Sequence, residues 1–244
     1  MMGMALVAVI WDFDGVLVFT PHEEAWKRAA EKYGASIDHS FYVKYVSGKP
    51  RYEGAHNILQ LTGLYEKHGA TTNEAREKLL REFAEFKNNI VNEMFDRGEY
   101  TVNDGAIEFL LSIRELGIPS ALASASKNAP LLAAKVKVGG LRLIDLFEVN
   151  SSGKAPTKKE VFRLAMRELK GKYPQIKAFF VVEDAPAGVM AAKELGAFVL
   201  GYERETILKE ADIRFEDFRE LSPKVLFELA EEGSPNVPVS ISRV

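Results

Sequence analysis

The stretch VAVIWDFDG, residues 7–15, decides the fold of this 244-residue chain. Its first five residues are apolar and run directly into the polar sequence DFDG. An apolar run of this length is typical of a strand buried in a parallel sheet, and ligands of open α/β sheets bind at the carboxyl ends of the strands. Gly15 permits a sharp turn after the strand, which would let the carboxylates of Asp12 and Asp14 face one site.

The composition excludes several classes of protein. Hydrophobic residues make up 47% of the chain, so it can bury a full core, and its length predicts one domain or a core with a smaller insertion. The formal net charge of -3 gives no electrostatic reason to expect nucleic acid, and the absence of cysteine excludes disulfides and thiolate chemistry. No apolar run approaches the roughly 18–20 residues of a membrane span, and the apolar N-terminus fits a first strand better than a signal peptide. We therefore expect a soluble cytoplasmic protein without nucleic-acid or membrane partners.

Residues 22–99 have an almost wholly helical pattern. Apolar residues at helical spacing predict helices over His22–Tyr33 and Arg51–Leu61, and either Thr72 or Asn73 would cap a third, longer one. No strand pattern interrupts this block, so it is expected to form a helical insertion.

After Gly98 the chain alternates between strand and helix patterns. The predicted strands are Ile118–Ala123, Phe147–Asn150, Ala178–Val182 and Phe198–Gly201, and the predicted helices are Ala106–Leu116, Pro130–Val138, Lys158–Leu169 and Gly188–Leu195. This alternation predicts an α/β fold with a doubly wound parallel sheet. The expected core is residues 1–20 and 100–244, with a helical cap at 21–99 and a partly disordered tail from Gly233 to Val244.

Polar groups follow the other predicted strands as well. ASASKN (123–128) comes after one strand, Glu183 and Asp184 come after another, and the lysine-rich segment GKAPTKK (153–159) lies between them. In a doubly wound sheet these ends converge on one crevice, where clustered carboxylates repel unless a cation lies among them. Oxygen ligands suit Mg²⁺, and Asp12, Glu183 and Asp184 are the natural candidates. A carboxylate can also attack phosphorus, with a hydroxyl, backbone N–H groups and a lysine holding the phosphate oxygens.

Three motifs resemble those of the haloacid dehalogenase-like phosphotransferases. They are DFDGVL (12–17), ASAS followed by KN (123–128), and VVEDAPAGVMAAKELGA (181–197). The resemblance is greatest to the branch that contains β-phosphoglucomutase and sugar-phosphate phosphatases, and it extends over nearly the whole chain. It implies an α/β core with an inserted helical cap.

The resemblance also implies roles for individual residues. Asp12 would be the nucleophile and a metal ligand, and Asp14 would be the general acid and base, with its backbone carbonyl facing Mg²⁺. Ser124 would bind the transferring phosphate. The remaining implied residues are Glu183 and Asp184 at the metal, with Gly15 and Ala125 at the substrate.

The catalytic lysine remains open between two positions. The family usually has Lys-Pro before a helix, whereas this chain has GKAPTKKEVF (153–162). Lys154 follows a glycine, while Lys158 stands at the predicted helix N-terminus, and the spacing does not decide between them. Lys159 is assigned to the surface.

The predicted cap contains a second set of candidates. SGKPRYEGAHNIL (47–59) resembles a substrate-specificity loop, in which Arg51 would bind a second group on the substrate and Lys49 would assist. The alternative is that Arg51 is a solvated residue near a helix N-terminus, where its charge gains nothing from the helix dipole. His22 would line the mouth of the site. Phe19 stands where the family has an acidic residue, which implies a changed hinge rather than a dead enzyme.

These observations predict an Mg²⁺-dependent phosphatase that hydrolyses a small phosphorylated metabolite, such as a sugar phosphate, through an aspartyl phosphate. The alternative enzyme is a β-phosphoglucomutase-type phosphotransferase, which would use the same site. A third hypothesis is a non-catalytic scaffold that binds a phosphometabolite. The resemblance also disfavours a dehalogenase, because family members with that activity lack the second aspartate, whereas Asp14 is present here.

Overall fold

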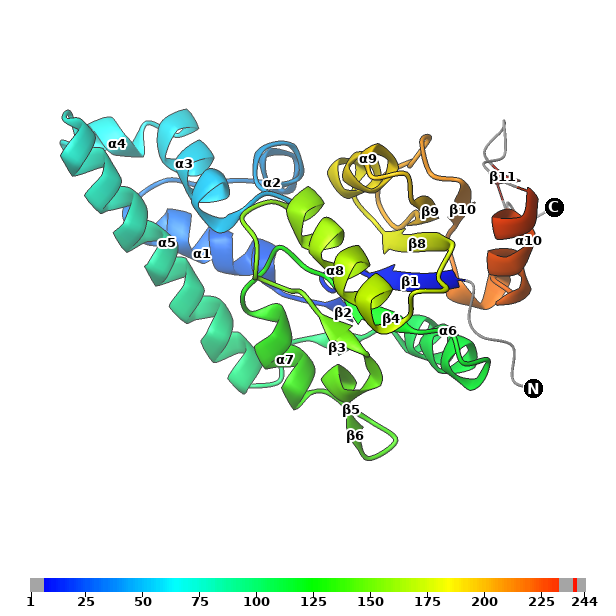
Figure 1. The fold of residues 1–244 in the computed structure, drawn as a ribbon. Coiled ribbons are helices and arrows are strands. Elements are labelled where there is room, and N and C mark those ends of the chain that lie inside the picture. The colour runs from blue at the N-terminus through cyan, green and yellow to red at the C-terminus, as the bar shows by residue number, and fades with distance from the viewer. Residues whose placement is uncertain (1–6, 233–238, 241–244) are drawn as a thin grey trace. The chain divides into compact units, whose positions relative to one another are not determined.

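The fold comes from a computed structural model that describes residues 7–232 and 239–240 (Figure 1). The chain divides into two compact units. One runs from the start of the chain to Phe19 and resumes at Val102, and the other is Thr20–Thr101. Most of the tail that was predicted to be partly disordered lies outside the described residues. In the part of the chain described, no helix combines the length and apolar character that crossing a membrane requires.

The first unit contains a seven-stranded parallel sheet, in the order β11-β10-β9-β8-β1-β4-β7. Its strands are β1 (Val7–Trp11), β4 (Ser120–Leu122), β7 (Val149–Asn150), β8 (Ala178–Glu183), β9 (Phe198–Tyr202), β10 (Ile213–Phe215) and β11 (Val239–Ser240). Its helices are α6 (Asp104–Glu115), α7 (Ala129–Lys135), α8 (Lys158–Lys172), α9 (Pro186–Glu194) and α10 (Lys224–Glu232), with 3₁₀ turns η1 (Leu143–Leu146) and η2 (Phe218–Glu220). The predicted α/β class is confirmed.

Strand β1 is an inner strand of this sheet, between β8 and β4, and its two faces pack against different helices (Figure 1). Alternate residues of a strand point to opposite faces. Ile10 is fully buried in the same apolar cluster as Phe162 of α8, whereas the Trp11 ring lies 6.1 Å from that of Phe109 in α6 and 6.0 Å from that of Phe218. A fully buried side chain of this size contributes about 1.5–3 kcal/mol, so burial on both faces explains the unbroken apolar run of β1.

The strand register brings the polar segments to one edge of the sheet. Trp11 pairs with Leu122 of β4 on one side and with Val182 of β8 on the other. The residues that follow these three positions therefore emerge side by side at the carboxyl ends of adjacent parallel strands. This is the edge at which ligands of such sheets bind.

The prediction of a helix over Pro130–Val138 is wrong at the C-terminal end of that range. Helix α7 stops at Lys135, and the chain then forms an antiparallel hairpin of β5 (Lys137–Val138) and β6 (Leu141–Arg142). Gly139 and Gly140, which were expected to terminate the helix, both have positive φ angles, of 53° and 87°. Two adjacent residues with positive φ form the favoured tight turn of a hairpin, so the glycine pair belongs to the turn.

The second unit, Thr20–Thr101, is helical. It contains α1 (His22–Tyr33), α2 (His39–Tyr45), α3 (Arg51–Leu61), α4 (Leu64–Lys67) and α5 (Asn73–Asp96). Its apolar core includes Trp26, Ile58 and Phe83, and the rings of Trp26 and Phe83 lie 5.8 Å apart. The hydroxyl of Thr72 accepts a hydrogen bond from the backbone N–H of Ala75 and caps α5, as a threonine before a helix favours. The chain leaves the first unit at β2 (Val18–Phe19) and returns at β3 (Thr101–Val102), and these two short strands pair with each other.

Candidate active site

A tight loop after β1 presents the first pair of carboxylates. The backbone N–H of Asp12 donates to the carbonyl of Val182, which continues the sheet one residue beyond β1. The chain then turns back, and the N–H of Gly15 donates to the carbonyl of Val18 at 2.9 Å. Gly15 has a φ of +82°, a conformation that L side chains rarely adopt. The turn inferred from the sequence is therefore present.

Three carboxylates meet at the edge of the sheet. Oxygens of Asp12, Glu183 and Asp184 lie within 4.8 Å of one another. Asp12 is 3% exposed and Glu183 is fully buried. One oxygen of Glu183 accepts hydrogen bonds from the backbone N–H groups of Asp184 and Ala185, both at 2.8 Å, which fixes this side chain. Asp14, also on the loop, is half-buried.

Two glycines leave room for this cluster. A Cβ on Gly15 would lie 2.1 Å from Oδ2 of Asp184, and a Cβ on Gly188 would lie 2.1 Å from Oε1 of Glu183. Gly188 is on α9, the helix that follows the two carboxylates. Any larger residue at either position would have to displace a carboxylate.

Of the two candidate lysines, the structure brings Lys158 to the cluster. Lys158 is the first residue of α8, and Thr157 caps this helix by accepting from the N–H of Glu160. Its Nζ lies 3.0 Å from Oδ2 of Asp12 and also forms an ion pair with Glu183. Lys154 is exposed on the preceding loop, and the geometry therefore favours Lys158.

Burial and neighbouring charges shift the pKa values of the groups in this cluster. Burial raises the pKa of Asp12 well above its usual range, although Lys158 opposes this effect. Desolvation, followed by the charge of Glu183, raises the pKa of Asp184 to about 7. Burial alone would lower the pKa of Lys158, but the nearby carboxylates raise it instead, so its ammonium form persists.

This arrangement fits a divalent metal ion. The donors are hard carboxylate oxygens that converge within 4.8 Å, and burial together with their mutual repulsion raises the pKa values of Asp12 and Asp184. Such a set suits Mg²⁺, which takes one or two protein carboxylates together with water and substrate oxygens.

The segment after β4 forms a compact turn at the neighbouring strand end. Ser124 is 2% exposed; its Oγ accepts from the N–H of Ser126 at 3.1 Å, and its own N–H donates to Oγ of Ser152. Gly153 packs so closely here that a Cβ would lie 2.8 Å from Cα of Lys127. Ala125, the other residue predicted on this turn, is half-buried. The register of β1 and β4 puts this turn beside the loop that carries Asp12.

The remaining predicted residues lie in the helical unit, and each has a partner there. Arg51 forms an ion pair with Glu85 at 3.2 Å, and Lys49 forms one with Glu53 at 2.7 Å. Nδ1 of His22 lies 3.0 Å from Nζ of a buried lysine, Lys87.

Lys87 was missed by the sequence analysis. It is 5% exposed, and its Nζ lies over the Trp26 ring at 4.7 Å from the centroid. The signal was its position on α5, because Lys87 stands four residues after the buried Phe83 and four before the buried Val91. A lysine on the apolar stripe of an amphipathic helix is unusual enough to mark a buried charge.

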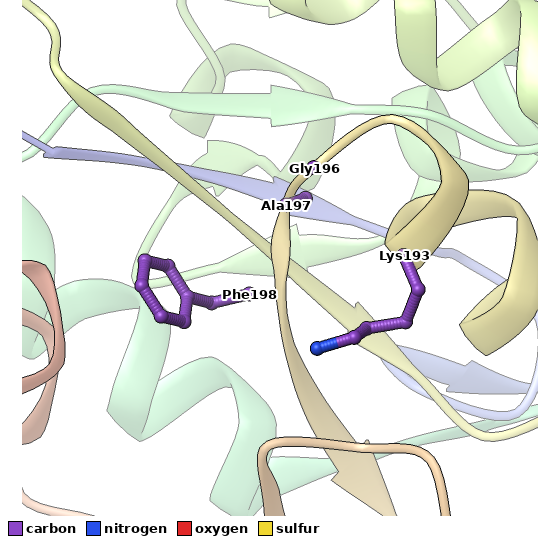
Figure 2. A pocket seen from close by; sticks show the side chains of 4 residues that line it. All are labelled: Lys193, Gly196, Ala197 and Phe198. Atoms are coloured by element: carbon purple, nitrogen blue, oxygen red, sulfur yellow. The ribbon is translucent and has the colours of Figure 1, made fainter. Parts of the chain in front are cut away.

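A cavity of about 310 Å³ lies elsewhere in the first unit (Figure 2). It is lined by Lys193 near the end of α9, Gly196 and Ala197 in the turn, and Phe198 at the start of β9. The amino end of β9 is at the opposite edge of the sheet from the carboxylates. This cavity is therefore separate from the candidate site.

The chain is similar in sequence and in fold to known proteins. A family model described as haloacid dehalogenase-like hydrolase matches residues 6–196. A β-phosphoglucomutase of Bacillus subtilis (strain 168) is 27% identical over 92% of this chain and 96% of its own length. A validoxylamine A 7′-phosphate phosphatase of Streptomyces hygroscopicus subsp. limoneus is 26% identical over 87% of this chain and 94% of its own. A crystal structure described as an archaeal β-phosphoglucomutase from the hyperthermophile Pyrococcus sp. strain ST 04 is 61% identical, with a TM-score of 0.83 over 93% of this chain and all of that one.

Proposed function

The chain belongs to the haloacid dehalogenase-like hydrolase family and is an enzyme that acts on phosphate esters, and we propose that it is a metal-dependent phosphatase of a small phosphorylated metabolite. The observation that carries the proposal is the buried cluster of Asp12, Glu183 and Asp184 with Lys158, at the carboxyl edge of the sheet. By their descriptions, the relatives named above are a β-phosphoglucomutase and a phosphatase of validoxylamine A 7′-phosphate. A sugar phosphate is accordingly the proposed substrate class.

Asp12 is the proposed nucleophile. One of its carboxylate oxygens attacks phosphorus, the bond to the ester oxygen breaks, and the phosphoryl group is carried as an aspartyl phosphate. Asp14, two residues further along the same loop, donates a proton to the leaving alcohol and then accepts one from the water that hydrolyses the intermediate. The tight turn at Gly15 supports this assignment because it keeps the two aspartates on one short loop.

Asp12, Glu183 and Asp184 would hold Mg²⁺, together with the backbone carbonyl of Asp14. When bound, the ion supplies positive charge that reduces the repulsion between a carboxylate nucleophile and a phosphate. Lys158 contributes the same kind of charge from the chain itself, since its ammonium group contacts Asp12.

Ser124 and the N–H groups of the turn after β4 would bind the phosphate oxygens. The Oγ of Ser124 accepts a hydrogen bond from the N–H of Ser126. The hydroxyl proton of Ser124 can therefore be donated to a phosphate oxygen. Backbone N–H groups around Gly15 and Ala125 would add further donors.

The helical unit is the proposed cap and would select the substrate. Arg51 is the first residue of α3 and Lys49 lies two residues before it, in the segment that resembles a specificity loop. Their ion pairs with Glu85 and Glu53 involve carboxylates that are 53% and 51% exposed. Such pairs contribute little to stability, so an anionic or hydroxyl group on the substrate could replace them at small cost.

A second candidate is phosphoryl transfer of the β-phosphoglucomutase type. The 61% identity with the Pyrococcus structure favours it, because that protein is described as such a mutase. The chemistry at Asp12 would be the same, but the phosphoryl group would return to a sugar rather than to water.

Phosphate release tests the proposal directly. The purified protein is incubated with a panel of sugar phosphates and p-nitrophenyl phosphate, in Mg²⁺ and in EDTA. We expect release in Mg²⁺ and its loss in EDTA, because the carboxylate cluster repels a phosphate unless a cation is bound. Release that persists unchanged in EDTA would contradict the metal-dependent mechanism.

A coupled assay separates the two candidates. β-Glucose 1-phosphate is supplied with a trace of the bisphosphate, and glucose 6-phosphate and inorganic phosphate are measured in the same reaction. Isomerisation without net phosphate release would establish the mutase. Phosphate release without isomerisation would establish the phosphatase.

Gly15→Ala is expected to impair Mg²⁺ binding more than folding. The positive φ costs an L residue about 1–2 kcal/mol, and the new Cβ would lie 2.1 Å from Oδ2 of Asp184. The Asp184 side chain can rotate away, which relieves the clash but moves a metal ligand. We expect the Mg²⁺ dissociation constant, measured by titration calorimetry, to rise by about tenfold or more, since metal sites lose this much when ligand orientation is disturbed.

Gly117→Ala is the matched control for this substitution. Gly117 has a φ of +73°, but a Cβ there would meet no atom within 4 Å. It should therefore cause a similar loss of thermal stability with unchanged Mg²⁺ binding. Equal Mg²⁺ affinities in the two variants would contradict the placement of Asp184 in the metal site.

A further inference from the structure

Arg204 stacks on Phe19, a residue that the site described so far does not use. The guanidinium carbon of Arg204 lies 4.2 Å from the centroid of the Phe19 ring, which is cation–π distance. Both residues belong to the first compact unit. The Arg204 side chain is 33% exposed, so it is partly buried beside this ring.

The backbone on the N-terminal side of Arg204 is anchored. The N–H of Glu203 donates to the carbonyl of Phe215 at 2.8 Å, and its carboxylate accepts from Arg214 at 2.7 Å. The N–H of Arg204 itself donates to the carbonyl of Tyr202, the last residue of β9. Arg204 is therefore held at a defined place just beyond the carboxyl end of that strand.

Both partners of the stack lie beside the carboxylate cluster. Strand β9 is the neighbour of β8, and Gly201 pairs with Glu183. Phe19 follows Val18, whose carbonyl accepts from Gly15, and Gly15 is the residue packed against Asp184. Desolvation and Glu183 raise the pKa of Asp184, whereas the positive charges of Lys158 and Arg204 lower it, so the charge of Arg204 acts on the cluster.

We propose that Arg204, held in place by the ring of Phe19, is a second cation of the site that sets the charge met by an incoming phosphate. The inference rests on the proposed function. Asp14 carries a proton when it acts as the general acid, so Asp12, Glu183 and Asp184 bring three negative charges, which Lys158 and a divalent ion together would offset. Arg204 then adds a positive charge, and the site attracts a phosphate dianion.

Arg204 is a positioning residue in this proposal, because it acts through the charge of the site and not by contact with the reacting atoms. Within the part of the chain that the structure describes, Arg204 forms an ion pair with Glu205 at 3.3 Å, and that carboxylate is 55% exposed. Exposed pairs of this kind are weak. The stack on Phe19 is the better anchor, since planar guanidinium groups pack well on aromatic faces.

The charge hypothesis predicts opposite effects on two ligands. In Arg204→Gln, removal of a positive charge should tighten the binding of Mg²⁺ and weaken the binding of inorganic phosphate at saturating Mg²⁺. Loss of one partly solvent-screened charge beside the cluster should change each dissociation constant by about two- to fivefold at low salt. Local misfolding would weaken both ligands, so the opposite signs separate the two explanations.

Titration calorimetry with MgCl₂ alone, and then with phosphate, measures both constants without turnover. Arg204→Lys should keep values near those of the wild type because the cation is retained. Phe19→Leu should shift the dissociation constants of Mg²⁺ and phosphate in the same directions as Arg204→Gln does, but by smaller factors. In the double variant, Phe19→Leu should add nothing to Arg204→Gln, because the ring matters only through the cation it holds.

Arg142→Gln is the matched control, since it removes the same charge from the β5–β6 hairpin, where Arg142 pairs with Asp145. Arg142→Gln should leave the dissociation constants of Mg²⁺ and phosphate unchanged. The effects of Arg204→Gln on these constants should become smaller as the ionic strength rises from about 0.02 M to about 0.3 M. Unchanged constants in Arg204→Gln, weakening of both ligands, or equal shifts in Arg142→Gln would each overturn the inference. A wild-type protein that binds no Mg²⁺ would instead overturn the proposed function.

Discussion

Asp12→Asn is expected to lower turnover by about 10⁴-fold or more while the fold persists. The amide keeps the shape of the carboxylate but lacks the nucleophilic oxygen anion. Asp12 is 3% exposed and burial raises its pKa, so the charged form is the costly one and a neutral side chain is tolerated. The hydrogen bond that extends the sheet at this residue uses its backbone N–H and is unaffected.

Two measurements check this prediction. Turnover is followed by phosphate release, and folding by the thermal midpoint with and without Mg²⁺. In the wild type Mg²⁺ should raise the midpoint because it binds only the folded state, and this gain should be smaller in Asp12→Asn. Asp145→Asn makes the same chemical change in the 3₁₀ turn η1, where the carboxylate is 39% exposed, and should alter neither quantity. Turnover of Asp12→Asn near that of the wild type would contradict the assignment of the nucleophile.

The sequence predicts the fold and the carboxylate cluster because both depend on local patterns. The apolar run before Asp12 can only be buried on both faces, and parallel strands must end at a common edge. The register observed for Trp11 then brings together residues more than 170 positions apart, namely Asp12 with Glu183 and Asp184. Helix boundaries such as Thr157 and Thr72 follow equally from local capping.

Other features of the fold and the site depend on contacts between residues far apart in the sequence, which a local pattern does not predict. The sequence does not decide between Lys154 and Lys158 as the lysine of the site. Lys158 is favoured because it begins α8 and its Nζ contacts Asp12, which follows β1. Gly139–Gly140 is compatible with a helix stop and with a hairpin turn, and the pairing of Lys137 with Arg142 decides between them. The stack of Arg204 on Phe19 joins residues from two different strand ends, so neither segment reveals it alone.

Lys158→Met is expected to have the second-largest effect, on both stability and turnover. The ammonium of Lys158 is the partner of two side chains, Asp12 at 4% and Glu183 at 0% exposure, so its removal leaves buried carboxylates without compensation. Breaking such a buried pair costs about 3–5 kcal/mol in the free energy of unfolding. Turnover should fall by about 10²–10³-fold, the usual loss when one group that stabilises transition-state charge is removed.

Metal binding should partly reverse the loss of stability, because a divalent ion supplies the positive charge that Lys158 no longer provides. The midpoint of Lys158→Met should therefore rise more on addition of Mg²⁺ than that of the wild type, and this difference is the specific signature of a charge within the cluster. Lys154→Met is the matched control: the residue is exposed on the preceding loop, so its loss should leave the unfolding free energy within about 0.5 kcal/mol. If Lys154→Met lost turnover while Lys158→Met kept it, the loop lysine would be the catalytic one, and the ion pairs of Lys158 would serve only to hold α8 against β1.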